Sequence, residues 1–349
     1  MGYINPFLAT EKNLHAEASA KNLLISKPDG TNAHALVTSF PAAMLDLTNS
    51  ETRTWIKGII KTNLIDDGLS GWMADFGEWA PPQGVKLASG ANPEHHHNAY
   101  PVEWARLNYE AIVEAGKEYE NVFFVRAGYS GTSRWAPIVW AGDQLVNWSL
   151  DDGLATVIPA ALSLGYCGVG VSHSDIGGYT TVAWVKRSKE LFQRWAELAA
   201  FTPVFRTHEG NRPDANWQFH SDSETLSHFA RMAKIHSHIA PYVKVLLNEY
   251  QNTGMPLMRH MALHCENDSI AAAQKYQYFY GKDLLVAPVY RRGKKEWKVY
   301  VPAGRWVHVW SEREFAEGWH TVPAPIGEPP VFWNAESAFA QLFRTIASA

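Results

Sequence analysis

Short apolar runs alternate with longer amphipathic segments over about residues 20–254. Five runs have the length and residue types of strands: Ala35–Ser39, Gly71–Ala74, Val122–Val125, Ile138–Trp140 and Gly168–Val171. Apolar residues recur at helical spacing between them, as in Val102–Tyr119,. This alternation is typical of βα units around a parallel sheet. Because the units are too few for a ring of eight, the pattern predicts an α/β fold with an incomplete parallel barrel.

The pattern changes near residue 255. Before it, a long helix is expected over Glu224–Thr253, opened by a capping box of Ser221 and Glu224 and closed by Gly254,. After it, LLVAPV, EWKVYVPAG and RWVHVW are short β-branched and aromatic runs between turn residues,. We therefore expect a partial α/β barrel over residues 1–254 and an antiparallel β-sandwich domain, complete or in part, over 255–349.

Composition narrows the classes of function. Lys plus Arg is 31 and Asp plus Glu is 35, and the resulting formal charge of −4 does not favour nucleic acid or an anionic membrane as a partner,. No apolar run is long enough to cross a bilayer,. The two cysteines have no CxxC spacing and the adjacent His95, His96 and His97 lack further ligands, so no metal site is predicted,. The 15 Trp suit a sugar-binding cleft, although most single rings belong to a core,.

Polar side chains follow four of the expected strands. They are Asp75, Arg126, Asp143, and the pair His173 and Asp175. In a parallel barrel the reacting groups lie at the carboxyl ends of strands. Two carboxylates suit glycoside hydrolysis, in which one attacks the anomeric carbon and the other donates a proton, and this chemistry needs no cofactor. An Asp after a strand is also a common helix cap or ion-pair partner, and spacing alone does not decide between these roles.

Five motifs carry a resemblance to a known family. GWMADFGE, RAGYSG, WAGDQ, HSDIGGY and RWAELAAFTPVFRTH occur over residues 71–208 in the order found in glycoside hydrolase family 31. The chain most resembles the sulfoquinovosidase branch of that family. LLVAPV and VYVPAGRWVHVW also resemble the β domain that follows the family's barrel. The likeness covers nearly the whole chain. It implies that residues 1–254 are the C-terminal part of a TIM (β/α)8 barrel, a partial catalytic barrel that lacks its first strands.

The resemblance implies roles for individual residues. Asp75 takes the position of the nucleophile, and Asp143 takes that of the general acid/base in a retaining mechanism. Family members line the subsite for the non-reducing sugar at the positions of Arg126, Trp140, Asp175 and His208. Tyr179 stands where the α-glucosidases of the family tend to have Phe, and in the sulfoquinovosidase branch this tyrosine helps to hold the sulfonate group.

The implied function is a retaining α-glycoside hydrolase that releases sulfoquinovose from α-sulfoquinovosides such as sulfoquinovosyl glycerol. A neutral-sugar α-glucosidase or α-xylosidase, and an inactive fragment with residual sugar binding, stay open as alternatives. The family's chain carries an N-terminal β-sandwich and further barrel strands before the segment that Gly2–Ala9 resembles, so we expect an N-terminally truncated chain. The expected partner is a small sulfonated glycoside, the expected location is the cytoplasm, and a homo-oligomer is left open.

Overall fold

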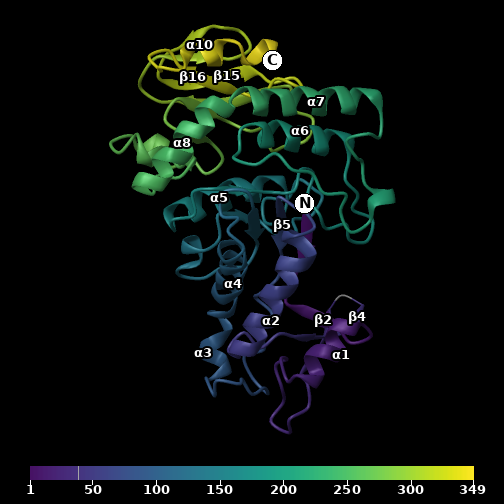
Figure 1. The fold of residues 1–349 in the computed structure, drawn as a ribbon. Coiled ribbons are helices and arrows are strands. Elements are labelled where there is room, and N and C mark those ends of the chain that lie inside the picture. The colour runs from purple at the N-terminus through teal and green to yellow at the C-terminus, as the bar shows by residue number, and fades with distance from the viewer. Residues whose placement is uncertain (38) are drawn as a thin grey trace. The chain divides into compact units, whose positions relative to one another are not determined.

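The computed structural model describes residues 1–37 and 39–349. These residues form two compact units, Met1–Val139 and Trp140–Ala349 (Figure 1). Each unit is described by itself below. Among the described residues, no helix combines the length and the apolar character that crossing a membrane requires.

The first unit is built on a parallel sheet. Its strands are β1 (Gly2–Ile4), β5 (Gly71–Ala74), β6 (Val122–Val125) and β7 (Ile138–Trp140), hydrogen-bonded in that order. Trp72 of β5 is fully buried, stacks on Phe123 of β6 and donates its indole N–H to Asn108 of the neighbouring helix. The predicted strands over β5, β6 and β7 are confirmed residue for residue, because each is a continuous apolar run,.

Helices and a small antiparallel sheet complete this unit. The helices are α1 (Asn13–Ala20), α2 (Ser50–Ile60), α3 (Pro93–His97) and α4 (Tyr100–Glu114), with a π-helix at Lys61–Ile65 and a 3-10 turn at Thr132–Arg134. The sheet has the order β2 (Phe7–Ala9), β4 (Phe40–Met44), β3 (His34–Val37).

Two expectations for this unit are wrong. The run Ala35–Ser39 is not a barrel strand: β3 pairs antiparallel with β4 and is mostly exposed, unlike a parallel strand covered on both faces, and Thr38 lies outside the described residues,. The helix expected over Val102–Tyr119 ends at Glu114. Gly116 has a φ of +67°, and the N–H of Lys117 returns to the carbonyl of Ile112, which closes the helix early,.

The second unit begins within β7 and continues through one short strand and several helices. The N–H of Ala141, just after β7, donates to the carbonyl of His173 in β8 (Ser172–His173). The helices are α5 (Val157–Tyr166), α6 (Lys189–Ala200), α7 (Ser223–His238), α8 (Ala240–Thr253), α9 (Ser269–Ala272) and α10 (Ala340–Arg344). Short 3-10 turns occur at Leu154–Thr156, Pro213–Ala215, Met261–Leu263 and Ile346–Ser348.

Two local expectations for this unit are corrected. The strand expected over Gly168–Val171 starts later, at Ser172, because Gly168 with a φ of +83° ends α5 and the N–H of Val169 still bonds back to Leu164. The single helix expected over Glu224–Thr253 is two helices. Pro241 in the first turn of α8 cannot donate to the preceding turn, so the chain breaks at Ile239,.

The start of α7 also differs from the expected capping box. Asp222, rather than Ser221, caps the helix, and its carboxylate accepts the N–H of Thr225,. The expected end of the following helix is confirmed: Gly254 after α8 has a φ of +77°, the left-handed conformation that glycine adopts without strain,.

An antiparallel β domain closes the second unit, as the sequence predicts. One sheet has the order β14 (Glu314–Phe315), β13 (Trp306–His308), β16 (Val331–Asn334), β11 (Leu284–Val286), β10 (Tyr278–Tyr280), β9 (Met258–Arg259). The other pairs β12 (Glu296–Val301) with β15 (Gly318–Pro323). Leu285 and Phe332 of the first sheet share a buried core with Val299 and Val322 of the second. The predicted domain boundary near residue 255 stays a prediction.

A buried ion pair joins α6 to this β domain. The guanidinium of Arg194 lies 2.8 Å from the carboxylate of Glu197 and also donates to the carbonyls of Lys294 and Ala324. The carboxylate of Glu197 in turn accepts the N–H of Gly327 at 2.6 Å. Figure 1 shows α6 and α7 beside the strands of the β domain, and this network fixes α6 there.

Candidate active site

The predicted site residues fall into two groups, one in each compact unit. In the first unit, Asp75 follows directly after β5 and is 7% exposed. One carboxylate oxygen, Oδ2, accepts the hydroxyl of Tyr3 at 2.6 Å, and the other accepts the N–H of Phe76 at 2.8 Å. Asn5 donates to the same hydroxyl of Tyr3 at 3.1 Å. Both oxygens of Asp75 are therefore held in fixed directions.

Tyr3 reaches Asp75 because of strand pairing. β1 lies parallel to β5 with Ile4 opposite Ala74, and the N–H of Asp75 donates to the carbonyl of Ile4. Tyr3 is 52% exposed, and the partial burial of its side chain, together with the charge of Asp75 beside it, raises the pKa of Tyr3 above its ordinary value,. The phenol therefore keeps its proton and remains a hydrogen-bond donor to the carboxylate.

Arg126, which follows β6, connects Asp75 to a second acid. Its Nε lies 3.4 Å from Oδ1 of Asp75, and its Nε and Nη2 donate to Oε1 of Glu78 at 3.0 and 2.6 Å. Its guanidinium carbon also lies 4.1 Å from the ring centre of Phe76,. Asp75 and Arg126, both predicted from the sequence, thus lie next to each other. Glu78 and the ring of Phe76 orient the guanidinium of Arg126.

Phe76 occupies an unusual backbone conformation. Its φ of +59° lies in the left-handed region, which is rarely adopted by a bulky side chain,. Gly77 follows with a φ of +118°, and a Cβ there would lie 3.2 Å from Pro101. Strain of this kind persists only where surrounding structure enforces it and is common at functional sites. Here it directs the Phe76 N–H toward Asp75 and its ring toward Arg126.

In the second unit, Asp143 lies in an exposed loop after β7. The loop is anchored by its backbone: the carbonyl of Asp143 accepts the hydroxyl of Thr180 at 2.8 Å, and the carbonyl of Gln144 accepts the N–H groups of Tyr179 and Thr180. Gly142 turns the chain with a φ of +82°. The loop therefore presents an accessible carboxyl group on a fixed backbone.

Arg206 organises the buried groups near this loop. Its guanidinium pairs with the carboxylate of Asp175, which is 1% exposed, and its Nε donates to Nε2 of His173 at 3.0 Å. Burial and the charge of Arg206 lower the pKa of His173 well below its ordinary value, so the imidazole is neutral and accepts this bond through Nε2,. Burial lowers the pKa of Arg206, against the opposing negative charges of Asp175 and Asp143.

His208 and Tyr179 form a second part of this group of residues. Their rings meet edge to face, with centres 4.9 Å apart. Burial lowers the pKa of His208, against the opposing charge of Asp175. Arg187 fixes the backbone here by donating to the carbonyls of Gly177 and His208, and burial lowers the pKa of Arg187 to about 10. The structure thus groups three of the predicted residues, Asp175, Tyr179 and His208.

Trp140, the remaining predicted site residue, is 2% exposed at the end of β7. Residues that sequence reasoning missed are Tyr3, Glu78 and Arg206. Glu78 ends the motif GWMADFGE and Arg206 lies within RWAELAAFTPVFRTH, so both were visible as charged residues inside quoted motifs. Tyr3 carried no such signal. Among the described residues, no cluster of three or more His, Cys, Asp or Glu side chains is placed to hold a metal ion.

Comparison with known proteins identifies the family of this chain. Residues 1–245 match the glycosyl hydrolases family 31 TIM-barrel domain, and residues 254–339 match the family's C-terminal domain. This chain belongs to glycosyl hydrolase family 31. The family 31 chain therefore consists of TIM-barrel residues followed by the family's C-terminal sheet domain, in agreement with the predicted fold class.

Two curated relatives and a solved structure point to one branch of the family. The family 31 chain is 48% identical over 348 residues to a sulfoquinovosidase of Escherichia coli (strain K12), covering 100% of this chain and 51% of that protein. It is 44% identical over 349 residues to a sulfoquinovosidase of Agrobacterium fabrum (strain C58), covering 99% and 52%. A solved family 31 sulfoquinovosidase from E. rectale, in complex with the aza-sugar inhibitor IFGSQ, superposes with a TM-score of 0.98 at 44% identity, covering 99% and 52%. The chain spans about half the length of the curated relatives it matches.

Proposed function

We propose that this chain carries the catalytic residues of a retaining α-glycoside hydrolase that acts on α-sulfoquinovosides. The observation that carries the proposal is the identity of 48% and 44%, along essentially the whole chain, to two sulfoquinovosidases. The local geometry of Asp75 supports it, because a nucleophile must be held in one orientation and donors from Tyr3 and Phe76 do so,. A small sulfonated glycoside is the proposed partner.

The first step forms a covalent intermediate. A carboxylate oxygen of Asp75 attacks the anomeric carbon from the face opposite the leaving group, and the glycosidic carbon–oxygen bond breaks. The bonding electron pair stays with the departing oxygen, which takes the proton of Asp143. Arg126 and Tyr3 hold the attacking carboxylate during this step.

The second step releases the sugar. The carboxylate of Asp143, now without its proton, removes a proton from a water molecule that attacks the anomeric carbon. The bond to Asp75 breaks, and the free sugar has the same anomeric configuration as the substrate. The exposure of Asp143 suits this role, since the group must meet both the leaving group and water.

Recognition of the sugar is assigned to five further residues. We assign Arg126, Trp140, Asp175 and His208 to the subsite of the non-reducing sugar and Tyr179 to the sulfonate. The support for Tyr179 is its hydroxylated ring packed edge-on against His208, whose carbonyl accepts a hydrogen bond from Arg187.

The catalytic assignment is tested with Asp75→Asn. The amide cannot displace the leaving group, so hydrolysis of nitrophenyl α-sulfoquinovoside should fall by at least roughly a thousandfold. Proton NMR of the first-formed sugar should show the α anomer. Substantial turnover by Asp75→Asn, or a β anomer as first product, contradicts the mechanism.

The substrate is tested separately by parallel assays on nitrophenyl α-sulfoquinovoside and nitrophenyl α-glucoside. A higher kcat/KM on the sulfonated glycoside is expected. A preference for the plain glucoside would support a neutral-sugar α-glucosidase instead, and binding of either sugar without hydrolysis would support a chain that only binds sugar.

A further inference from the structure

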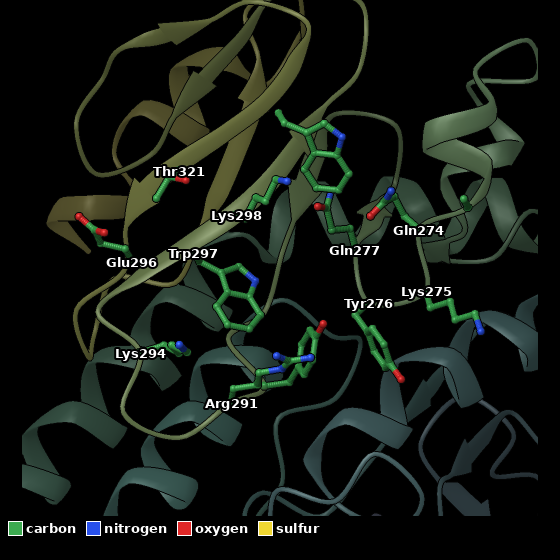
Figure 2. A pocket seen from close by; sticks show the side chains of 13 residues that line it. Gln274, Lys275, Tyr276, Gln277, Arg291, Lys294, Glu296, Trp297, Lys298 and Thr321 are labelled. Atoms are coloured by element: carbon green, nitrogen blue, oxygen red, sulfur yellow. The ribbon is translucent and has the colours of Figure 1, made fainter.

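A pocket of about 610 Å³ lies in the β domain, on a face that no catalytic assignment uses. β12 contributes Glu296, Trp297 and Lys298, β15 contributes Trp319 and Thr321, and the chain segments before β10 and β12 supply the rest. Figure 2 shows Trp297, Lys298, Gln277 and Tyr276 arranged around this hollow. Its volume is in the range of sites that hold a small molecule.

Aromatic rings form much of the pocket lining. The rings of Tyr290 and Trp297 meet edge to face at 5.0 Å and 86°, and those of Tyr276 and Tyr290 lie 4.4 Å apart at 37°. Trp319 is 44% exposed, although a core would bury such a ring,. Exposed aromatic faces suit the apolar C–H face of a pyranose. The neighbouring rings are inclined to each other at 37° and 86°, so they do not form a pair of parallel faces between which a planar nucleobase could stack.

The pocket is also strongly cationic. Its described lining residues include four cations, Lys275, Arg291, Lys294 and Lys298, and one acid, Glu296, whereas the whole chain has a formal charge of −4. Among the described residues, none of these four cations forms an ion pair. Their charges are therefore available to a ligand, and their concentration on one face of an acidic chain favours an anion.

The cations lie directly beside the rings. Nζ of Lys298 lies 4.6 Å from the ring centre of Trp319, and the guanidinium carbon of Arg291 lies 5.8 Å from that of Tyr290. Thr321 is the cross-strand partner of Lys298 and offers an exposed hydroxyl. Ring faces, cations and a hydroxyl are thus combined within one pocket, which matches a sugar that carries both hydroxyl groups and an anionic substituent.

We propose that this pocket is a second saccharide site, which binds a soluble anionic glycoside away from the catalytic residues. The pyranose ring lies against Trp319 and Trp297, and the sulfonate, sulfate or phosphate group contacts Lys298 and Arg291. This inference does not depend on the catalytic assignment, because it rests on the β domain alone.

The test follows indole N–H signals by NMR in the 349-residue chain carrying Asp75→Asn, so that turnover does not consume the ligand. The signals of Trp297 and Trp319 are assigned through Trp297→Phe and Trp319→Phe. The probes are methyl α-sulfoquinovoside, methyl α-glucoside and ADP. We expect the sulfonated glycoside to shift both signals, and Lys298→Gln to weaken this binding about fivefold, the effect of losing one modest charged contact.

Lys282→Gln is the matched control, since Lys282 is an exposed lysine of the same domain outside the pocket. It should leave the affinity unchanged. The proposal is overturned if neither indole signal moves, or if Lys298→Gln and Lys282→Gln bind alike. Equal affinity for methyl α-glucoside would remove the anionic part of the proposal, and tighter binding of ADP would identify a nucleotide site. Since the readout is local to Trp297 and Trp319, these outcomes are separate from any failure of hydrolysis.

Discussion

The hydroxyl of Tyr3 donates a 2.6 Å hydrogen bond to Oδ2 of Asp75, across 72 positions of the chain. The bond exists because β1 pairs in parallel with β5. It links the first residues of the chain to the proposed nucleophile. A three-residue strand at the N-terminus is therefore part of the proposed catalytic machinery as well as of the sheet.

Tyr3→Phe removes this donor and keeps the ring. If Tyr3 orients Asp75 for attack, kcat on an α-sulfoquinovoside should fall by roughly 10- to 100-fold, the range for a hydrogen bond to a charged group, with little change in KM. Tyr119→Phe is the matched control, since Tyr119 is 97% exposed. Steady-state kinetics of both variants measures the effect, and an unchanged kcat in Tyr3→Phe would show that the bond is only structural.

Arg206→Met should destabilise the second unit. It removes the partner of Asp175, whose side chain is 1% exposed, and the donor to His173. A buried charge left without its partner typically costs roughly 3 kcal/mol or more of unfolding free energy. Denaturant unfolding measures this loss, with Arg212→Met at an exposed arginine as the control. Equal stability of the two variants would contradict a structural role for the Arg206–Asp175 pair.

The Arg194–Glu197 pair gives a sharper stability test, because both side chains are at most 2% exposed. Arg194→Met should cost roughly 3–5 kcal/mol, since Glu197 then remains buried and charged, whereas the double variant Arg194→Met, Glu197→Met should recover part of that loss. For comparison, Lys61→Met at the exposed Lys61–Asp66 pair should cost less than about 1 kcal/mol,. Thermal unfolding of the four proteins is the measurement. A double variant less stable than Arg194→Met would argue against this account.

Stability should also depend on His308 below neutral pH. Burial lowers the pKa of His308 from 6.5 to about 4 in the folded chain. Above pH 6.5 the side chain is neutral in both states, and as pH falls toward 4 the unfolded chain gains the proton first. This linkage removes about 3 kcal/mol of unfolding free energy across that window.

His308→Gln should therefore show a flatter decline of unfolding free energy between pH 6.5 and 4 than the unmodified chain. His220→Gln, at an exposed histidine, should follow the unmodified chain. Denaturant titrations at a series of pH values measure the two slopes. If the unfolding free energies of His308→Gln and the unmodified chain fell in parallel with pH, His308 would not contribute to the pH dependence of stability.

The elements that could be predicted from the sequence are those whose conformation is determined by their own residues. Strands β5, β6 and β7 are short, continuous apolar runs, so their limits could be read directly. β1 could not be recognised, because GYI is short and gains its strand conformation from pairing with β5. The break at Ile239 was missed because apolar periodicity continues through Pro241 and outweighed the missing N–H.

The same distinction applies to the site. Asp75, Arg126 and Asp175 could be found because each follows an apolar run. Arg206 follows no strand: it comes beside Asp175 because its carbonyl accepts the N–H of Ile176 and Thr207 forms an isolated bridge with Ile176. Contacts set by such long-range backbone pairing leave no periodic trace in the sequence.

The left-handed backbone of Phe76 limits which substitutions that position can accept. Glycine or asparagine would relieve the unfavourable φ of +59° but would remove the ring beneath Arg126, whereas tyrosine or tryptophan would keep a ring and retain the strain,. A saturation library at position 76 should therefore separate into variants that gain stability and variants that keep turnover, with few that do both. Phenylalanine at position 76 therefore combines reduced stability with retained turnover, and selection for stability alone or for turnover alone would not favour the same residue.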